Sequence, residues 1–408
     1  MIKQKGSAIY IWGIADLYFI LAVTVLILFG VLSPGIQKEL HLNSTQLGLL
    51  GFASFLSFGA TQFLAGSLLD SKGPRITLTV SAGIATIGLF LLSQASGFYP
   101  AIIAQVIIGI GFSIAYVGAI YLAATLFPQK QFPLLSGITQ MSASGISSLF
   151  LIGLALTNSA SIDFRILTRN LAFLTLFIGL LLFLIVRKPS TPTQNVPKKT
   201  SFWIDLYKLL KIPQFWFGAI YFSANMGVFL AFSSLWNVPD SLAYGHSLSI
   251  ATLLSGTLRL GGGLGAAISG VFANRLGKPY NLVKWYSSGA LGLGILLIYG
   301  PIFPTPITFL VMALLGFFFG GTALGFPLVG EYIPLTLKGT GFGLMTSFAY
   351  LLSAFLQYLT GNLLDYTTSL HLFQTVGKFK IALTPLILVL ILGWICSLKL
   401  HSYNKIYH

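Results

Sequence analysis

The chain has 408 residues, of which 55% are hydrophobic and only 8% are charged, and its net charge is +15. A soluble domain carries about 25% charged residues, so this composition excludes a globular protein covered by water and favours a membrane protein. The positive charge does not indicate nucleic-acid binding, because the basic residues lie in short loops between apolar runs, where they would face anionic lipid.

Histidine and cysteine give no sign of a metal, haem or catalytic centre. The single cysteine, Cys396, lies in an apolar run, and the five histidines form neither an HxxxH nor an HExxH pair. A membrane enzyme or metalloprotein would need such groups inside its spans. We therefore expect a protein that is not an enzyme and that uses no metal or cofactor.

Twelve apolar runs follow one another along the chain, each close to the roughly 20 residues that cross a bilayer. They occupy residues 9–33, 45–69, 76–96, 99–125, 133–157, 166–186, 212–236, 248–273, 281–300, 304–328, 339–363 and 380–399. The sequence thus predicts an all-α membrane protein with twelve transmembrane helices.

The loops between these runs differ in charge. Lys and Arg gather in every second connection, on the side of the N-terminus, whereas the other side holds only Lys38, Arg165, Arg169, Lys378 and Lys380. Basic residues concentrate in cytoplasmic loops. We therefore expect both termini in the cytoplasm and the protein in a bacterial inner membrane.

The middle of the chain separates two halves. Basic, proline-rich residues at 187–200 indicate an exposed linker, and the polar and apolar spacing up to residue 211 indicates an amphipathic helix at the membrane interface. We expect one six-helix bundle over residues 1–186, a cytoplasmic linker over 187–211 and a second bundle over 212–408.

A loop pattern recurs at the same place in both halves. GSLLDSKG begins at Gly66, after the second predicted helix, and GVFANRLG begins at Gly270, after the eighth. An internal repeat of this kind is typical of duplicated transporter halves. The two six-helix bundles are therefore expected to be pseudo-symmetric.

Two loop motifs resemble those of a known family. GSLLDSKGPR, at residues 66–75, resembles the major facilitator superfamily signature G-x-L-x-D-R-x-G-R-R. EYIPLTLKGT, at residues 331–340, is similar to the second cytoplasmic signature of that superfamily, E-x-x-P-x-x-x-R-G-T. The resemblance covers the whole chain and implies the major facilitator fold and transport by alternating access.

Charged residues in these loops are expected to latch the cytoplasmic side shut. Asp70 ends the second helix and can face the partly positive N-terminus of the eleventh helix. Arg75 and Lys338 can pair with Asp70 or Glu331 across the two halves, whereas Asn274, at the equivalent place in the second half, carries no charge. The alternative is that these residues only end helices and set the topology.

A closer resemblance covers roughly the first 160 residues. The stretches at 61–75, 117–128 and 135–139 are similar to those of the phagosomal nutrient transporters of intracellular bacteria. That resemblance implies import of amino acids or nucleosides. The sequence departs from the group at Gln105, where most members carry an arginine, so the coupling route and the substrate do not follow from it.

Two charged residues lie well inside predicted spans, where each costs at least about 2.5 kcal/mol unless it is paired or solvated. Arg259, in the eighth helix, needs an anion, and we expect a substrate carboxylate to supply it. The alternatives are a structural ion pair with Asp16 and a side chain that snorkels to the membrane interface. Asp16, in the cytoplasmic half of the first helix, is expected to carry the coupling proton unless it is simply hydrated.

Uncharged polar side chains inside the spans are further candidates for binding substrate, although each can instead bond a neighbouring helix. They are Gln62, Tyr116, Gln140, Asn225, Tyr350 and Gln357.

These features together predict a monomeric secondary transporter that takes up a small polar metabolite, such as an amino acid, with protons. One alternative is a proton-driven exporter of a drug or siderophore. Such exporters usually carry a Gly-Pro signature in the fifth helix, which residues 137–150 lack. The other alternative is a sensor that uses the same fold without transporting.

Overall fold

A computed structural model of the chain describes residues 2–128, 131–156, 163–186, 207–209, 211–276, 279–334, 338–370 and 375–401. In these residues the regular secondary structure is helical throughout, so the all-α prediction is confirmed. The predicted linker and interfacial helix lie outside the described residues, except for residues 207–209 and 211.

Seven helices build the first half, and two of them, α4 and α5, together form one crossing. Their bounds are α1 (Ile2–Glu39), α2 (Ser44–Lys72), α3 (Pro74–Gln94), α4 (Phe98–Phe112), α5 (Ala115–Leu126), α6 (Phe132–Leu156) and α7 (Phe164–Ile185).

The second half contains three interrupted crossings. The seventh crossing joins α9, a π-helical turn (η3) and α10; the tenth joins α13, a 3-10 turn (η4) and α14; the twelfth joins α16 and α17. The bounds are α9 (Pro213–Ala231), η3 (Phe232–Trp236), α10 (Asn237–Ala243), α11 (Leu248–Leu276), α12 (Pro279–Tyr299), α13 (Thr305–Phe319), η4 (Gly320–Leu324), α14 (Gly325–Tyr332), α15 (Lys338–Ser369), α16 (Thr375–Ala382) and α17 (Thr384–Lys399).

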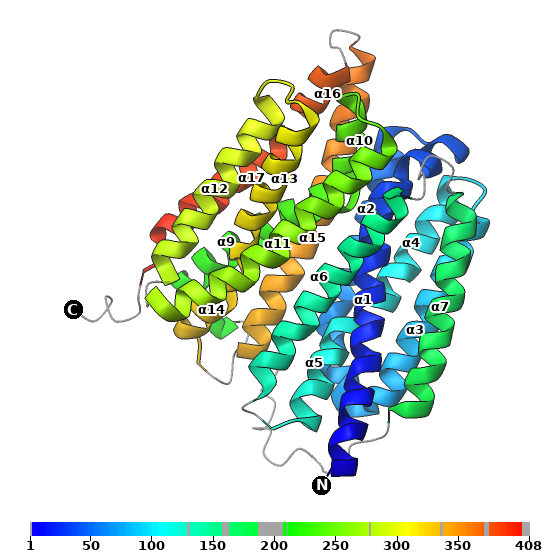
Figure 1. Cartoon of the computed structure of the whole chain (residues 1–408), viewed down its shortest axis with the longest axis vertical. Helices are drawn as coiled ribbons and strands as arrows, with labels where there is room; N and C mark the ends of the chain where they lie inside the picture. The colour runs from blue at the N-terminus through cyan, green and yellow to red at the C-terminus, as the bar shows by residue number, and fades with distance from the viewer. Residues whose placement is uncertain are drawn as a thin grey trace.

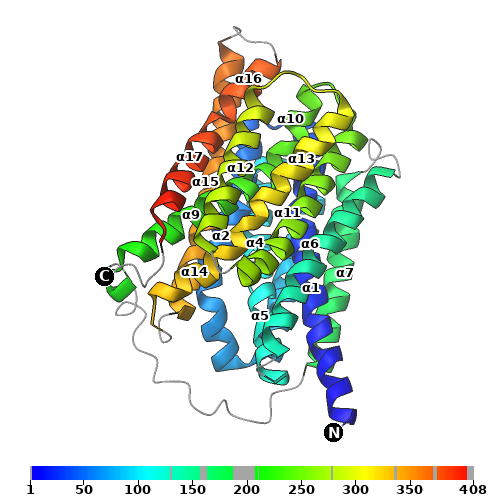
Figure 2. The same ribbon diagram turned by 60° about the vertical axis from the view of Figure 1, so that its left-hand side comes forward.

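Each predicted span corresponds to one crossing, which confirms the twelve-helix prediction. In the described part of the chain, ten helices are long and apolar enough to cross a membrane, and α2 and α11, of 29 residues each, complete the twelve. Both pack between other helices: α2 lies against α4 and α15, and α11 lies against α6 and α13. Figure 2 shows α11 running beside α6 and α13.

Two helices continue through a proline beyond the ends that the sequence predicted. α1 continues through Pro34 to Glu39, and the seventh crossing continues through Pro239 to Ala243. The predictions of ends at residues 33 and 236 were wrong because a bilayer offers no water to unpaired backbone groups, so a helix is kept even where proline removes one N–H. The π-helical turn η3 ends three residues before the second proline.

The helices run between two ends of the molecule (Figure 1). The proximal end is the one at which α1 begins, and α17 also ends there. The distal end is the one where α10 and α16 lie, at the top of the view.

The face of α2 that meets α15 shows that the two halves touch from the distal end to about the middle of these helices. A Cβ atom on Gly48 would lie 2.6 Å from the backbone oxygen of Gln357, and one on Gly59 would lie 3.0 Å from the Tyr350 side chain. Gly66 follows on the same face, seven residues nearer the proximal end, and meets nothing within 4 Å. The seam is therefore closed distally and open proximally.

α15 gives the same result from the other side. A Cβ atom on Gly361 would lie 2.3 Å from the backbone oxygen of Ser44, whereas Gly343, near the proximal end of α15, meets nothing within 4 Å. At the distal end the backbones approach so closely that any side chain would force them apart. The two halves thus meet backbone to backbone at the distal end.

A carboxylate strengthens the distal seam. Asp365, near the end of α15, accepts the backbone N–H of Ser44 with one oxygen at 3.0 Å and that of Thr45 with the other at 2.7 Å. These N–H groups belong to the first turn of α2, which has no backbone partner for them and carries the positive end of the helix dipole. Asp365 of the second half therefore caps a helix of the first half.

We predict that Asp365→Asn loosens the distal seam. The amide keeps an acceptor but loses the negative charge, and charge-assisted hydrogen bonds contribute about 1.5–3 kcal/mol, so opening is expected to increase roughly tenfold. Gln357 is fully buried at the seam, so a cysteine at this position is labelled by maleimide only when the seam opens. The labelling rate therefore measures the opening, in a background in which Cys396 is changed to alanine.

Asp163→Asn is the matched control for this measurement. Asp163 caps its own helix, accepting the N–H of Arg165 at 2.8 Å, and does not join the halves. Equal labelling rates in the Asp365→Asn and Asp163→Asn variants would show that the Asp365 cap does not hold the seam.

Candidate functional site

Arg259 of α11 is buried at the junction of the two halves, with 7% of its surface exposed. Its Nη2 donates to the Ser234 hydroxyl of η3 at 3.0 Å, and its guanidinium lies 5.5 Å from the centre of the Phe229 ring. Its Nε has no hydrogen-bond partner. Among the described residues no carboxylate approaches within 4 Å, so the expected alternative of an ion pair with Asp16 is absent from this conformation.

Ser234 connects this site to the distal seam. A Cβ atom on Gly30 of α1 would lie 2.7 Å from the Ser234 carbonyl oxygen, while the Ser234 hydroxyl holds Arg259. The arginine therefore lies directly beside the closed part of the seam.

One tyrosine lies near this cation and a second lies near the first. Tyr350 of α15 is close to Arg259, and Tyr116 of α5, in the other half, is close to Tyr350. Its ring packs against Phe58 of α2, with centroids 4.4 Å apart, and the Tyr116 ring packs against Phe19 of α1 at 5.0 Å. The structure thus brings three of the predicted binding residues together, with aromatic rings from both halves around them.

Asp16 lies in a separate polar cluster of the first half. One carboxylate oxygen accepts the Ser142 hydroxyl of α6 at 2.9 Å, and the other is buried without a partner. The Thr139 hydroxyl of α6 lies close to this carboxyl group, and the Trp12 indole N–H, one helical turn before Asp16 on α1, is buried without a partner. This cluster holds a carboxylate out of water with incomplete hydrogen bonding.

The neutral candidates are distributed more widely than predicted. The Gln62 amide oxygen is buried without a partner, and Gln140 of α6 is exposed. Asn225 donates to the Tyr221 carbonyl at 2.9 Å, within its own helix. Gln357 is fully buried in the distal seam, where its amide donates to Ser353 at 3.2 Å.

The described members of the predicted latch make contacts inside their own halves. Arg75 donates to the Phe183 carbonyl of α7 at 2.7 Å and stacks on that ring, and Glu331 of α14 accepts the Tyr280 hydroxyl of α12. The side chains of Asp70, Asn274 and Lys338 lie outside the described residues.

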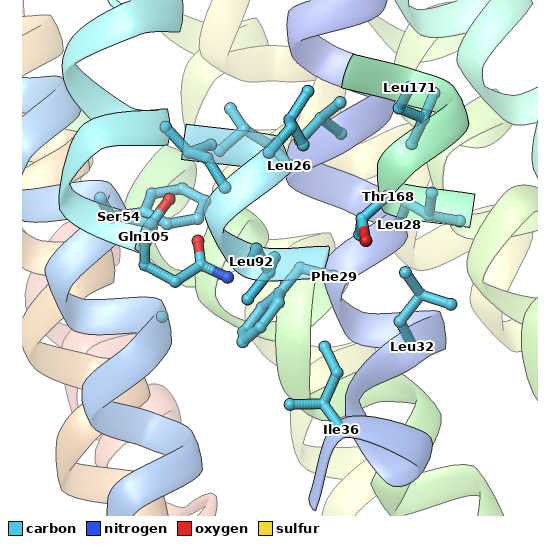
Figure 3. Close-up of a pocket in the computed structure, with 15 residues that line it drawn as sticks. Leu26, Leu28, Phe29, Leu32, Ile36, Ser54, Leu92, Gln105, Thr168 and Leu171 are labelled. Carbon is cyan, nitrogen blue, oxygen red and sulfur yellow. The ribbon is translucent and has the colours of Figure 1, made fainter. Parts of the chain in front are cut away.

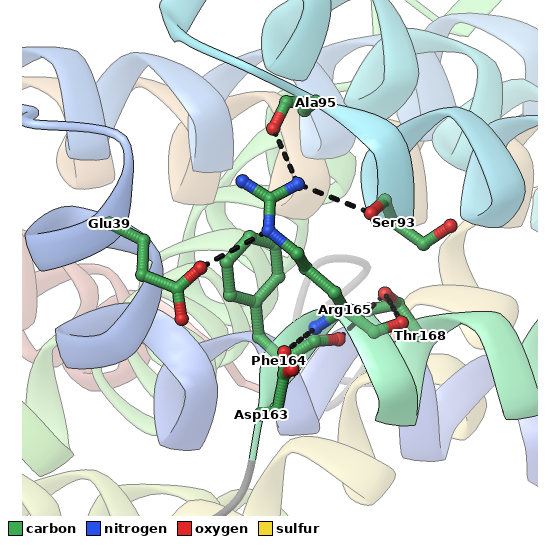
Figure 4. Close-up of polar contacts among 7 residues, drawn as sticks. All are labelled: Glu39, Ser93, Ala95, Asp163, Phe164, Arg165 and Thr168. Atoms are coloured by element: carbon green, nitrogen blue, oxygen red, sulfur yellow. Dashed lines mark hydrogen bonds and ion pairs between the residues drawn. The ribbon is translucent and has the colours of Figure 1, made fainter.

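At the distal end, unlike at Arg259, an arginine forms an ion pair with a carboxylate (Figure 4). The one ion pair found in the described part of the chain joins Arg165 to Glu39 at 3.1 Å. Arg165 also donates to the carbonyls of Ser93 and Ala95. This arginine is fully engaged at the distal end, in contrast to Arg259.

A buried space inside the first half is lined mainly by leucines and aromatic rings (Figure 3). The amide of Gln105, 3% exposed, and the hydroxyls of Ser54 and Thr168 are its polar groups. It holds no charge, and it includes the position at which the resemblance led us to expect arginine.

Sequence reasoning missed Asp240. Its carboxylate is 5% exposed and lies in α10, beyond the predicted end of the seventh helix. The sequence does contain a signal for it: Asp240 follows Trp236 by four residues, so a helix continued through Pro239 would have placed this acid inside the seventh crossing. In the described residues no group of three or more His, Cys, Asp and Glu could hold a metal.

The sequence is similar to those of known transport proteins. Probable nitrate/nitrite antiporter NarK1 of Thermus thermophilus is 24% identical over 306 residues, which cover 72% of this chain and 68% of that protein. Agnestins efflux protein AgnL12 of Paecilomyces divaricatus is 26% identical over 265 residues, or 62% of this chain and 58% of that protein.

The fold is also similar to that of a solved transporter. The crystal structure of a D-xylose–proton symporter superposes with a TM-score of 0.72 at 15% identity, covering 97% of this chain and 98% of that one. The family model for the Major Facilitator Superfamily matches residues 16–357. The chain therefore belongs to the major facilitator superfamily, and its family and fold are those of multi-pass membrane transporters.

Proposed function

We propose that this transporter moves a small planar oxyanion, bound through Arg259. The carboxylate of a metabolite such as an amino acid and an inorganic anion such as nitrate share this chemistry. The observation that carries the proposal is the unpartnered Nε–H of a buried guanidinium whose Nη2 is already held by Ser234. A fixed fork of donors suits two oxygens of one planar anion.

The energy of a buried charge supports an anionic substrate. An arginine inside a span costs about 2.5–3.5 kcal/mol or more, and the described residues supply no carboxylate to offset this cost. Tyr350 adds a hydroxyl group near the cation, and Tyr116 of the other half lies near Tyr350. An anion held between them would join the halves around the substrate. The similarity to a nitrate/nitrite antiporter supports an inorganic anion as one member of the class.

Alternating access follows from the open and closed parts of the seam. The halves at residues 1–186 and 212–408 rock about the substrate site, with the distal contacts of α2 and α15 breaking as the proximal ends approach. The basic loops assign the proximal end to the cytoplasm of an inner membrane. The conformation described above is then open to the cytoplasm, and a monomer is sufficient for the cycle.

Asp16 carries the coupling proton in this proposal. Its second oxygen is buried without a partner, and a proton placed there would let it donate a hydrogen bond. Asp16 lies in the first half and Arg259 in the second, so protonation and substrate binding act on different halves. Protons would drive uptake of the anion.

Export is the second candidate function. The similarity to an efflux protein favours it, although the match spans 58% of that protein. Residues 137–150 lack the Gly-Pro signature usual in exporters of this superfamily. A panel of hydrophobic cations, tested beside the anions, separates the two functions.

We predict that Arg259→Gln weakens anion binding roughly tenfold to hundredfold, since hydrogen bonds to a charged group contribute about 1.5–3 kcal/mol. Thermal unfolding of purified protein with nitrate, nitrite, amino acids and neutral sugars measures the binding, because a ligand stabilises only the folded state that binds it. Arg259→Lys should restore little of the anion binding, since the lysine ammonium group lacks the planar pair of N–H donors of a guanidinium.

Arg165→Gln is the control, because Arg165 is engaged at the distal end. It should bind like the wild type. If hydrophobic cations alone stabilise the protein, and Arg259→Gln responds as the wild type does, the anion proposal is wrong and export replaces it.

We predict that Asp16→Asn abolishes proton-driven accumulation in proteoliposomes and retains exchange of external for internal substrate. The amide cannot release a proton, whereas exchange needs no net proton movement. Asp163→Asn, which alters a carboxylate that caps a distal helix, should keep both activities. Accumulation driven by a proton gradient in Asp16→Asn would show that Asp16 does not carry the proton.

A further inference from the structure

A second pocket lies at the distal end of the second half, away from Arg259. It is formed where α10 meets the ends of α12 and α13, and it is partly open to solvent. Its polar lining includes Asp240, Tyr244 and Thr308, and its apolar lining includes Leu297, Phe303 and Met312.

Asp240 is the only acid in this lining. Its side chain is 95% buried, with 5% of its surface exposed, and it has no hydrogen bond or ion pair to any described residue. A carboxylate removed from water without a partner is costly, so a group that matches it would bind favourably.

The neighbouring hydroxyls act as acceptors towards the pocket, because their protons are used elsewhere. Tyr244 donates to the Ile298 carbonyl at 3.4 Å, and Thr308 donates to the carbonyls of Phe303 and Pro304 at 3.4 and 3.3 Å. Each hydroxyl oxygen keeps lone pairs for another donor. A carboxylate with two such oxygens selects a donor that carries positive charge.

The charged neighbours of Asp240 leave it unpaired. Lys380 of α16 donates to the Gly300 carbonyl at 3.2 Å and lies more than 4 Å from the carboxylate. His246 lines the same pocket and is partly exposed. Neither residue forms an ion pair with Asp240, so its carboxyl group is free to bind a cation.

The apolar wall determines what kind of cation fits. A bare metal ion requires about six oxygen ligands, and here most of the lining is carbon. Pockets with an apolar lining and a few convergent polar groups suit small organic molecules. An ammonium group on a compact alkyl body satisfies both parts of the pocket.

We propose that the distal pocket around Asp240 binds a protonated primary amine with a compact apolar group. The ammonium group donates to Asp240, Tyr244 and Thr308, and the alkyl group lies against Leu297, Phe303 and Met312. This site is separate from the oxyanion site and does not depend on it.

Binding there acts on the transport cycle. α10 packs against α1 of the other half and against α16, and through η3 it continues to Ser234 beside Arg259. An amine that fills the pocket holds α10 in the position of the closed distal end. It therefore slows transport without competing for the substrate site.

The first test is thermal unfolding of the full chain in detergent with isobutylamine and, as its uncharged counterpart, isobutanol. The amine should raise the melting temperature in a saturable way, by about 2 °C or more, and the alcohol should not. Asp240→Asn should lose the shift, Asp240→Glu should keep part of it, and Arg259→Gln should keep all of it.

The second test compares the melting temperature in sodium chloride with that in choline chloride. A rise in melting temperature with sodium alone, absent in Asp240→Asn, would assign the pocket to a metal cation and overturn the amine proposal. Equal shifts with isobutylamine and isobutanol would overturn it as well. Loss of the amine shift in Arg259→Gln would place the amine in the central site instead.

A cysteine reporter covers the case in which Asp240→Asn does not fold. Ile302 lines the pocket and is 64% exposed, so Ile302→Cys, with Cys396 changed to alanine, can be alkylated from the distal side. Isobutylamine should slow alkylation severalfold and isobutanol should not. Unchanged alkylation at saturating amine contradicts the proposal.

Discussion

Backbone contact between the halves at the distal end is the constraint from which the other features follow. Where Gly48 and Gly361 let α2 and α15 touch, the rest of each helix can diverge towards the proximal end. Ser234 belongs to both regions, since its carbonyl meets Gly30 in the closed seam and its hydroxyl holds Arg259. The buried cation is therefore placed where closure of one end can affect what it binds. A change at the seam reaches the site through one residue.

The crossings could be predicted because the bilayer imposes their length and apolar character. Their ends could not be predicted as well, because Pro34 and Pro239 signal helix ends in water and not in lipid. Continuing the seventh crossing brings Asp240 inside the protein. Because the seventh helix was predicted to end too early, Asp240 was not recognised as a buried acid.

The candidate site divides along similar lines. Arg259 and Asp16 could be found from sequence because charge inside a span is costly enough to need a reason. The roles of neutral residues depend on the orientation of each helix, which the sequence did not provide. Gln357 lies in the distal seam and Asn225 bonds its own helix, while Ser234 and Phe229, which contact the cation, are common residue types in any span.

The π-helical turn at Phe232–Trp236 shows how a site can depend on the number of residues and not on their identity. Such a turn holds one residue more than an α-helix does over the same length. Deleting a single residue there would restore an α-helix of the same length, so the segments on either side could keep their register. The side chains of the turn itself would be reoriented, which would move Ser234 away from Arg259 and Trp236 away from the Gln357 carbonyl without replacing either side chain.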